Sequence, residues 1–235
     1  MTFKKATVGM WTILVSQIIL LILYILLLTS FVLVLLVSNM NADYTFVSFV
    51  ADFVIILSEI EGIVTVISYV MAFVGIILAS TEVRKFRSAM VWGAIAAVLY
   101  LGITVYNIFT DRSMDDVGSL MGSIVMMVIS VTCIEGCISI AEKIRELKAA
   151  EFYEKCVKLV VIAYMATILM SMLNLILTDA NSFVTFFMIS TVISQLLCVI
   201  SYILLTIVLV KTLKMLRLYK EKVNAEEAEL KAEPA

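Results

Sequence analysis

The chain has 235 residues, of which 63% are hydrophobic and 15% are charged, and its formal net charge is −2. Soluble domains contain roughly half apolar and about a quarter charged residues, so this composition excludes a water-soluble globule and predicts an integral membrane protein. Histidine is absent, which removes the side chain that most often acts as a general base or metal ligand.

Six apolar runs follow one another along the chain, over about residues 8–37, 44–80, 89–109, 117–140, 157–177 and 183–210. Each is long enough for a membrane-spanning helix, which needs about 20 apolar residues, and none shows the alternation of a barrel strand. The pattern predicts an all-α polytopic fold with six transmembrane helices in residues 1–222 and an acidic, frayed cytoplasmic tail over 223–235. Since the first two runs exceed the bilayer thickness, we expect them to tilt or to project from it.

The first run follows Lys4 and Lys5 and is much longer than the apolar core of a signal peptide, which has roughly 7–15 residues. We therefore expect it to be retained as a membrane helix. Further on, Glu142 and Arg145, and Glu151 and Lys155, lie at helical spacing. These pairs predict a helix that continues out of the membrane over residues 141–158 before the chain turns back into the fifth run.

Lysine and arginine gather in four segments, and the other three connections are short and acidic. The basic segments are the N-terminus, 84–87, 143–158 and 211–222. Because an excess of basic residues marks the cytoplasmic side, both termini are predicted to be cytoplasmic, in a plasma membrane. The basic segments are also suited to anionic lipid headgroups, and no feature indicates nucleic-acid binding.

This layout predicts three helical hairpins that enter the membrane from the same side. Short matches favour an internal repeat: IEG at 60–62 recurs at 134–136, and VISY at 66–69 recurs at 199–202. Matches of this kind also arise by chance in apolar helices, so both duplication and coincidence stay open.

Four carboxylates within apolar runs are the candidate intramembrane polar site: Glu61, Glu135, Glu59 and Asp52. A carboxylate near the centre of the bilayer is costly and by default indicates function, and Glu61 lies nearest the middle of its run. Three of these carboxylates also have an explanation that involves no function. Asp52 and Glu59 are surface charges if the outer part of the second run stands in water, and Glu135 is near enough to the inner boundary to reach the headgroups.

Small residues predict close helix contacts at Gly118 and Gly122, which form a GxxxG pattern, and at Gly93, which lies in a second small-residue stripe between Ala89 and Ala97. Amide side chains are expected to hydrogen-bond between helices; these are Gln17, Asn107, Asn174 and Gln195.

Cys133, Glu135 and Cys137 do not share one helix face, so no metal site is expected there. No nucleotide-binding, metalloprotease or hydrolase motif occurs. We therefore expect no catalytic residues and no cofactor, and we expect that the protein is not an enzyme.

The opening FKKATVG, from Phe3, together with the six spans and the basic hairpin ends, resembles uncharacterised multi-pass membrane proteins of anaerobic Gram-positive bacteria. The resemblance covers the whole chain in general style. It implies a bacterial membrane location, and it implies no activity and no functional residue.

Two functions are consistent with these features. The first is a small transporter or channel-like protein, in which Glu61, and less directly Glu135, line a path for a cation or proton. The alternative is a non-transporting membrane scaffold or accessory protein, which binds a protein partner or a second copy of itself through its small-residue seams.

Overall fold

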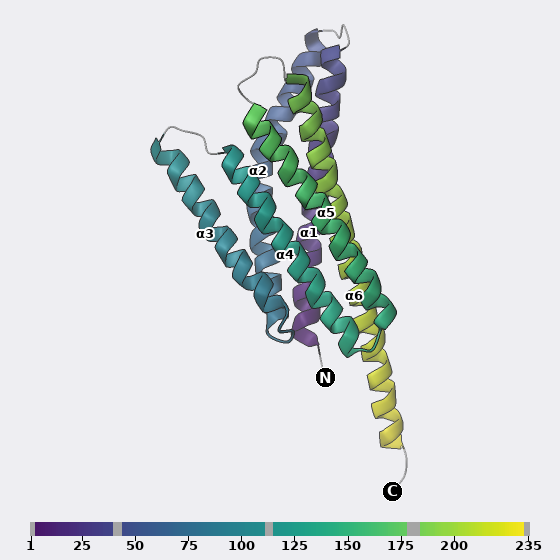
Figure 1. Cartoon of the computed structure of the whole chain (residues 1–235). Helices are drawn as coiled ribbons and strands as arrows, with labels where there is room; N and C mark the ends of the chain where they lie inside the picture. Colours follow the sequence, from purple (N-terminus) through teal and green to yellow (C-terminus); the bar gives the residue numbers. More distant parts are fainter. Residues whose placement is uncertain (1–2, 40–43, 111–114, 178–183, 233–235) are drawn as a thin grey trace.

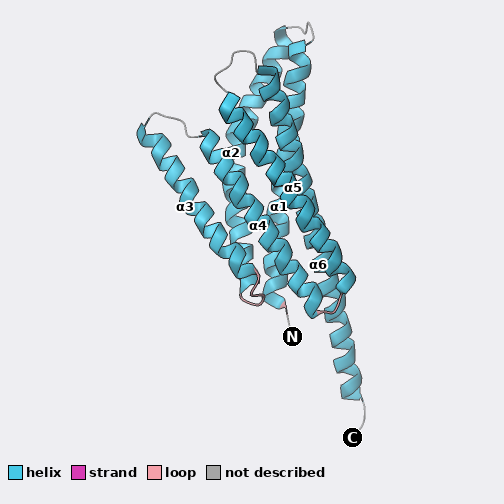
Figure 2. Cartoon of the chain, viewed as in Figure 1, coloured by secondary structure: helices cyan, strands magenta, loops and turns pink. Residues whose placement is uncertain are grey.

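The structure, a computed structural model, describes residues 3–39, 44–110, 115–177 and 184–232. These residues form six long helices joined by turns (Figures 1 and 2): α1 (Lys4–Asn39), α2 (Tyr44–Ser80), α3 (Phe86–Thr110), α4 (Asp115–Lys143), α5 (Leu147–Leu177) and α6 (Val184–Ala232). The predicted all-α class is confirmed, and no strand occurs in these ranges. Among the described residues, five helices contain a stretch long and apolar enough to cross a membrane, and the apolar stretch described in α3 is shorter and covers Phe86–Leu99.

The helices are arranged as a ring in which each packs against the next, and α1 closes the ring by packing against α6. Inside the ring α4 also reaches α6, whereas α3 contacts mainly its two sequence neighbours, α2 and α4. Figure 1 shows α3 leaning away from the other helices toward the end opposite the N-terminus. The bundle is therefore continuously packed from α4 through α5, α6 and α1 to α2, and it is more open beside α3.

Helix lengths differ enough to leave parts of the bundle unmatched. With 37 residues, α2 is longer by 12 than α3, which has 25. Because the two helices meet at the turn after Ser80, the excess falls at the start of α2, and it corresponds to about 18 Å of helix. Figure 1 shows the hairpin of α1 and α2 extending beyond the other helices at that end, while α6 extends beyond the bundle at the opposite end.

The main hydrophobic core lies at the end of the bundle that carries the N-terminus. Each helix contributes to it, and its largest fully buried side chains include Met10, Phe86, Tyr153 and Leu209. The hydroxyls of Tyr153 and Thr212 are hydrogen-bonded at 3.1 Å, which joins α5 to α6 within this core. Not every buried polar group there is satisfied, because Oγ1 of Thr206, on α6 between the core residues Leu205 and Val208, has no hydrogen-bond partner among the described residues.

The α1 and α2 backbones approach closely where two glycines face one another. A Cβ added at Gly75 would lie 2.6 Å from the carbonyl oxygen of Gly9 and 2.7 Å from Cγ1 of Ile13. Such a contact between backbones is possible only where both helices lack a side chain, as is common at helix crossings in membranes. The sequence pattern did not single out either glycine, because they are 66 positions apart and neither belongs to a short motif.

The turn between α4 and α5 corrects one prediction. The helix does not continue through 141–158: α4 ends at Lys143 and α5 begins at Leu147. The chain reverses in a Schellman motif, in which the N–H of Glu146 donates to the carbonyl of Ala141 and Arg145 adopts φ = 66°. The charged segment that follows is the first part of α5, where Glu151 and Lys155 form the expected pair, with a distance of 3.2 Å.

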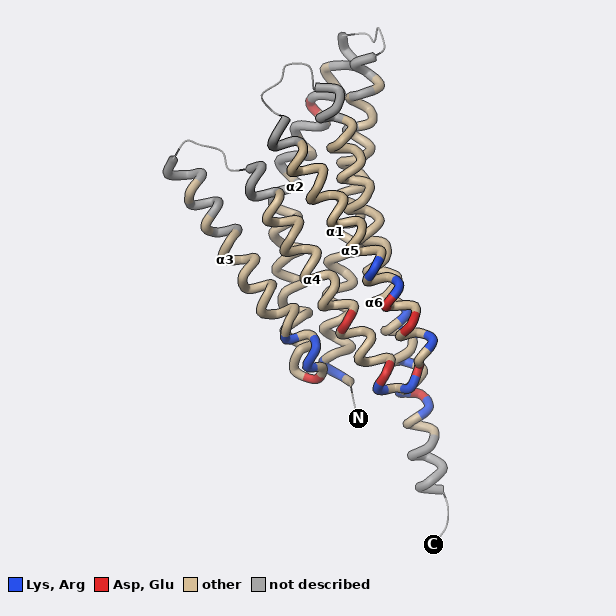
Figure 3. Tube along the Cα trace, viewed as in Figure 1, with Lys and Arg blue, Asp and Glu red and all other residues tan. Residues whose placement is uncertain are grey.

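Charged side chains are strongly segregated along the bundle. Figure 3 shows the described lysines and arginines at the end that carries the N-terminus, on the loops there and on the adjoining parts of α5 and α6. The basic segments that lie far apart in the sequence are therefore neighbours in space.

Candidate functional site

Asp52 is exposed in the structure and falls within the twelve residues by which α2 exceeds α3. This position is in line with the surface alternative for that residue. Glu59 and Glu61 belong to the helical backbone of α2, but their side chains lie outside the described part of the structure. Their role as an intramembrane polar site stays a prediction.

Glu135 lies on α4 close to the turn between α2 and α3. Its carboxylate is 3.9 Å from Nζ of Lys85, and the side chains are 45% and 62% exposed, respectively. The adjacent Gly136 is covered by the ring of Phe86, whose Cδ2 and Cζ would each be 2.6 Å from an added Cβ. This copy of IEG therefore attaches α4 to the turn between α2 and α3.

The two IEG glutamates lie at different depths in the bundle. Glu135 is eight residues before the end of α4, whereas Glu61 is nineteen residues before the end of α2. These intervals correspond to about 12 and 28 Å of helix. A difference of this size prevents the two carboxylates from holding one ion between them, so the repeated motif does not build a shared site.

The small-residue stripe on α3 and the GxxxG pattern on α4 do not pack against each other. Gly93 on α3 lies against Phe73 of α2, since an added Cβ would be 2.8 Å from that ring. Gly122 on α4 has no atom within 4 Å of an added Cβ, so the close contact predicted there is not made within the described part of the chain. The surroundings of Gly118 lie outside that part.

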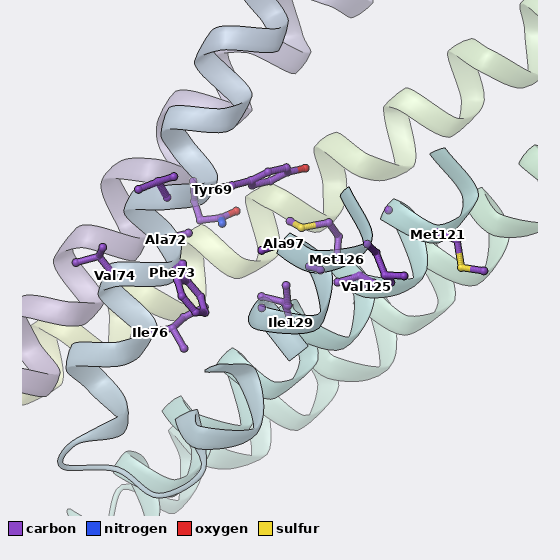
Figure 4. A pocket seen from close by; sticks show the side chains of 16 residues that line it. Tyr69, Ala72, Phe73, Val74, Ile76, Ala97, Met121, Val125, Met126 and Ile129 are labelled. Atoms are coloured by element: carbon purple, nitrogen blue, oxygen red, sulfur yellow. The ribbon is translucent and has the colours of Figure 1, made fainter. Parts of the chain in front are cut away.

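The small residues instead surround a cavity of about 230 Å³ between α2, α3 and α4 (Figure 4). Its lining comes from four helices: Gln17 of α1; Tyr69, Val70, Ala72, Phe73, Val74 and Ile76 of α2; Gly93, Ala96, Ala97 and Leu99 of α3; and Met121, Gly122, Val125, Met126 and Ile129 of α4. In Figure 4 Tyr69 and Phe73 project from α2 toward Ala97, Met126 and Ile129. Ligand sites are commonly of this kind, concave and apolar with few polar groups.

This cavity reaches the outer surface of the bundle. Four residues of its lining, Val70 and Val74 on α2, Leu99 on α3 and Met121 on α4, also have exposed side chains. The opening is therefore lateral, beside the splayed α3, and apolar side chains lie at its rim.

The side chain of Gln17 does not make the hydrogen bond between helices that the sequence predicts. Its side chain is only 4% exposed, yet Oε1 has no hydrogen-bond partner among the described residues. The same is true of Oε1 of Gln195, so the expectation that these amides bond between helices is wrong for both oxygens. Asn107 and Asn174 have side chains outside the described part. No sequence signal separates an amide that has a partner from one that has none.

Among the side chains that the structure describes, the thiols do not gather with carboxylates into a metal site. Cys133, Cys137 and Cys156 are buried free thiols, and no three potential ligands converge within the ranges that the structure covers. A scan against protein-family models, a search of curated proteins and a search of solved structures each found no match. The candidate site is thus defined by its own geometry.

Proposed function

We propose that the chain is a non-enzymatic, six-span protein of a bacterial plasma membrane that binds another component of the bilayer in the cavity between α2, α3 and α4. The observation that carries the proposal is the shared location of the small residues. Gly93 and Ala97 on α3 and Gly122 on α4 line one lateral opening, in which Gly93 lies against Phe73 and Gly122 faces open space. This favours a non-transporting protein over a transporter, with a bilayer component in the cavity in place of the protein partner that the small-residue seams predicted.

The helix lengths and charges support the topology in this proposal. The 25 residues of α3 correspond to about 37 Å, which exceeds the roughly 30 Å of a hydrocarbon core. If α3 crosses the membrane with the other five helices, both termini lie on one side. The basic residues at that end favour the cytoplasm, and they favour contact with anionic lipid headgroups.

Native mass spectrometry of the protein purified in mild detergent tests the proposal. We expect a non-covalently bound component, whose occupancy falls more than tenfold in Gly122→Leu because the new side chain fills the cavity. The matched control is Gly102→Leu on α3, another helical glycine with open space beside it, which does not line the cavity and should keep the component. Equal occupancy in the two variants, or no bound component in the wild type, would refute the proposal.

Transport remains the second candidate because of the position of two carboxylates along α2. Glu59 and Glu61 lie outside the twelve-residue excess of α2, in the stretch that α3 matches in length, where a carboxylate would be costly without a function. Proton and cation flux into proteoliposomes is the test, with Glu61→Gln as the variant. Absence of flux, or flux that is unchanged in this variant, removes the candidate.

A further inference from the structure

The side chain of Gln17 combines features that ordinary packing does not explain. It lies thirteen residues after the start of α1 at Lys4, about 20 Å along the helix, and it reaches the cavity between α2, α3 and α4. Its Oε1 is buried and has no donor among the described residues. An acceptor that is buried in an apolar environment without a partner is unfavourable, and such a group requires an explanation.

The cavity wall around Gln17 supplies almost no alternative partner. Of the residues that line it, only Gln17 and Tyr69 have polar side chains, and Tyr69 already interacts elsewhere. A buried water needs about two to four polar contacts, so this wall is poorly suited to an isolated water molecule. A phospholipid acyl chain would fill the space, but it has no donor to give to Oε1.

The volume limits what would fit. A dry apolar cavity of about 150 Å³ holds benzene, so the space of about 230 Å³ found here is sufficient for roughly nine non-hydrogen atoms by the same proportion. A whole phospholipid or a partner helix is much larger. The opening beside α3 means that the molecule arrives from the bilayer, so it must be lipophilic.

We propose that the cavity between α2, α3 and α4 binds a small lipophilic alcohol or phenol, whose hydroxyl donates a hydrogen bond to Oε1 of Gln17. The apolar part of the ligand lies against the small residues of α3 and α4, and the hydroxyl lies toward α1. This rests on the proposed function, because it names the chemical class of the bilayer component. The unpartnered acceptor of Gln17, in a space that is otherwise almost entirely apolar, selects a molecule with a donor over an acyl chain of equal volume.

Competition between two isomers measures this selection directly. The protein, in nanodiscs of dioleoyl phosphatidylcholine, is photolabelled with octanol that carries a diazirine, and labelled residues are located by mass spectrometry. Octan-1-ol and methyl heptyl ether serve as competitors at equal concentrations in the bilayer. They contain the same atoms, and only the alcohol has a donor. We expect labels on residues that line the cavity, such as Met121 and Met126, and roughly tenfold weaker competition by the ether, the effect of one buried hydrogen bond.

Two variants separate the hydrogen bond from the cavity itself. Gln17→Met keeps a side chain of similar length and removes the acceptor, so both isomers should compete equally, and the unliganded protein should remain folded because no existing hydrogen bond is lost. Gly122→Leu fills the space and should abolish labelling of the cavity. Gly102→Leu is the control that should behave as the wild type.

The outcomes distinguish this inference from the function on which it rests. If the two isomers compete equally in the wild type, or if Gln17→Met preserves the preference for the alcohol, the inference is wrong. The proposed function stands in that case as long as Gly122→Leu still abolishes labelling. If labelling is unchanged in Gly122→Leu, the cavity is not a binding site and both proposals are overturned.

Discussion

The crossing of α1 and α2 and the space between α3 and α4 both contain small residues, but the helices touch at the first and are separated by a cavity at the second. At Gly9 and Gly75 the helix backbones touch, and no side chain could be added without separating them. At Gly122 there is open space, and the neighbouring small residues of α3 line a cavity. A glycine in a membrane helix therefore permits close approach, but the neighbouring helices decide whether the approach is made. The first arrangement supports the bundle, and the second provides room for a ligand.

Alanine at the closed crossing should produce the largest effect on stability. In Gly75→Ala the new methyl group overlaps backbone and side-chain atoms of α1, which can be relieved only by moving the two helices apart. We expect the free energy of unfolding to fall by about 2–3 kcal/mol, as for severe overpacking. Titration with sodium dodecyl sulfate in mixed micelles, followed by circular dichroism, measures this change.

Gly122→Ala is the matched control for that substitution. Its methyl group enters open space, and alanine is favoured over glycine within a helix by about 1 kcal/mol, so stability should be unchanged or slightly higher. If the two alanine variants lost equal stability, the distinction between a closed crossing and an open cavity would be untenable.

Gly136→Ala should give the next largest effect. The added methyl group meets the ring of Phe86, which is fully buried and therefore has little room to move. A loss of about 1–2 kcal/mol in the free energy of unfolding is expected, smaller than at Gly75 because a ring shifts more easily than a backbone. Gly102→Ala, beside open space on α3, is the control. Equal stability of both variants would show that Phe86 does not fix α4 to the turn.

The sequence was sufficient to predict the helices because each is a long apolar run with polar residues at its ends. It also predicted which segments are basic, and these are neighbours in the fold. It failed where the answer depends on the neighbouring helices. The turn at Arg145 falls inside a segment with helical charge spacing, and the contact of Gly9 with Gly75 joins distant positions. Oε1 of Gln17 lacks a hydrogen-bond partner because of the side chains that neighbouring helices place around it.

Glu82 offers a smaller effect that is confined to the closed side of the bundle. Its Oε2 accepts a hydrogen bond of 2.9 Å from the N–H of Ala6 in the first turn of α1. A carboxylate in this position satisfies a free helix donor and favours the positive end of the helix dipole. Glu82→Ala should reduce the free energy of unfolding by about 1 kcal/mol, measured in the same micelles. Glu82→Gln keeps an acceptor without the charge and should lose about half as much. A larger loss in Gln than in Ala would contradict this assignment.

The pair between Lys85 and Glu135 should have the smallest effect, and it decides how Glu135 is understood. Both side chains are about half exposed and their charged atoms are 3.9 Å apart, so solvent screens the attraction and reduces it to about 0.5 kcal/mol or less. A double-mutant cycle with Lys85→Met and Glu135→Gln, analysed through the free energy of unfolding, measures the coupling. A small coupling that decreases with added salt fits a glutamate at the headgroup boundary, because screening acts on exposed charges. A coupling well above 1 kcal/mol would require the two charges to be shielded from water. Glu135 would then be an intramembrane carboxylate like Glu61, and a function in transport would again be indicated for it.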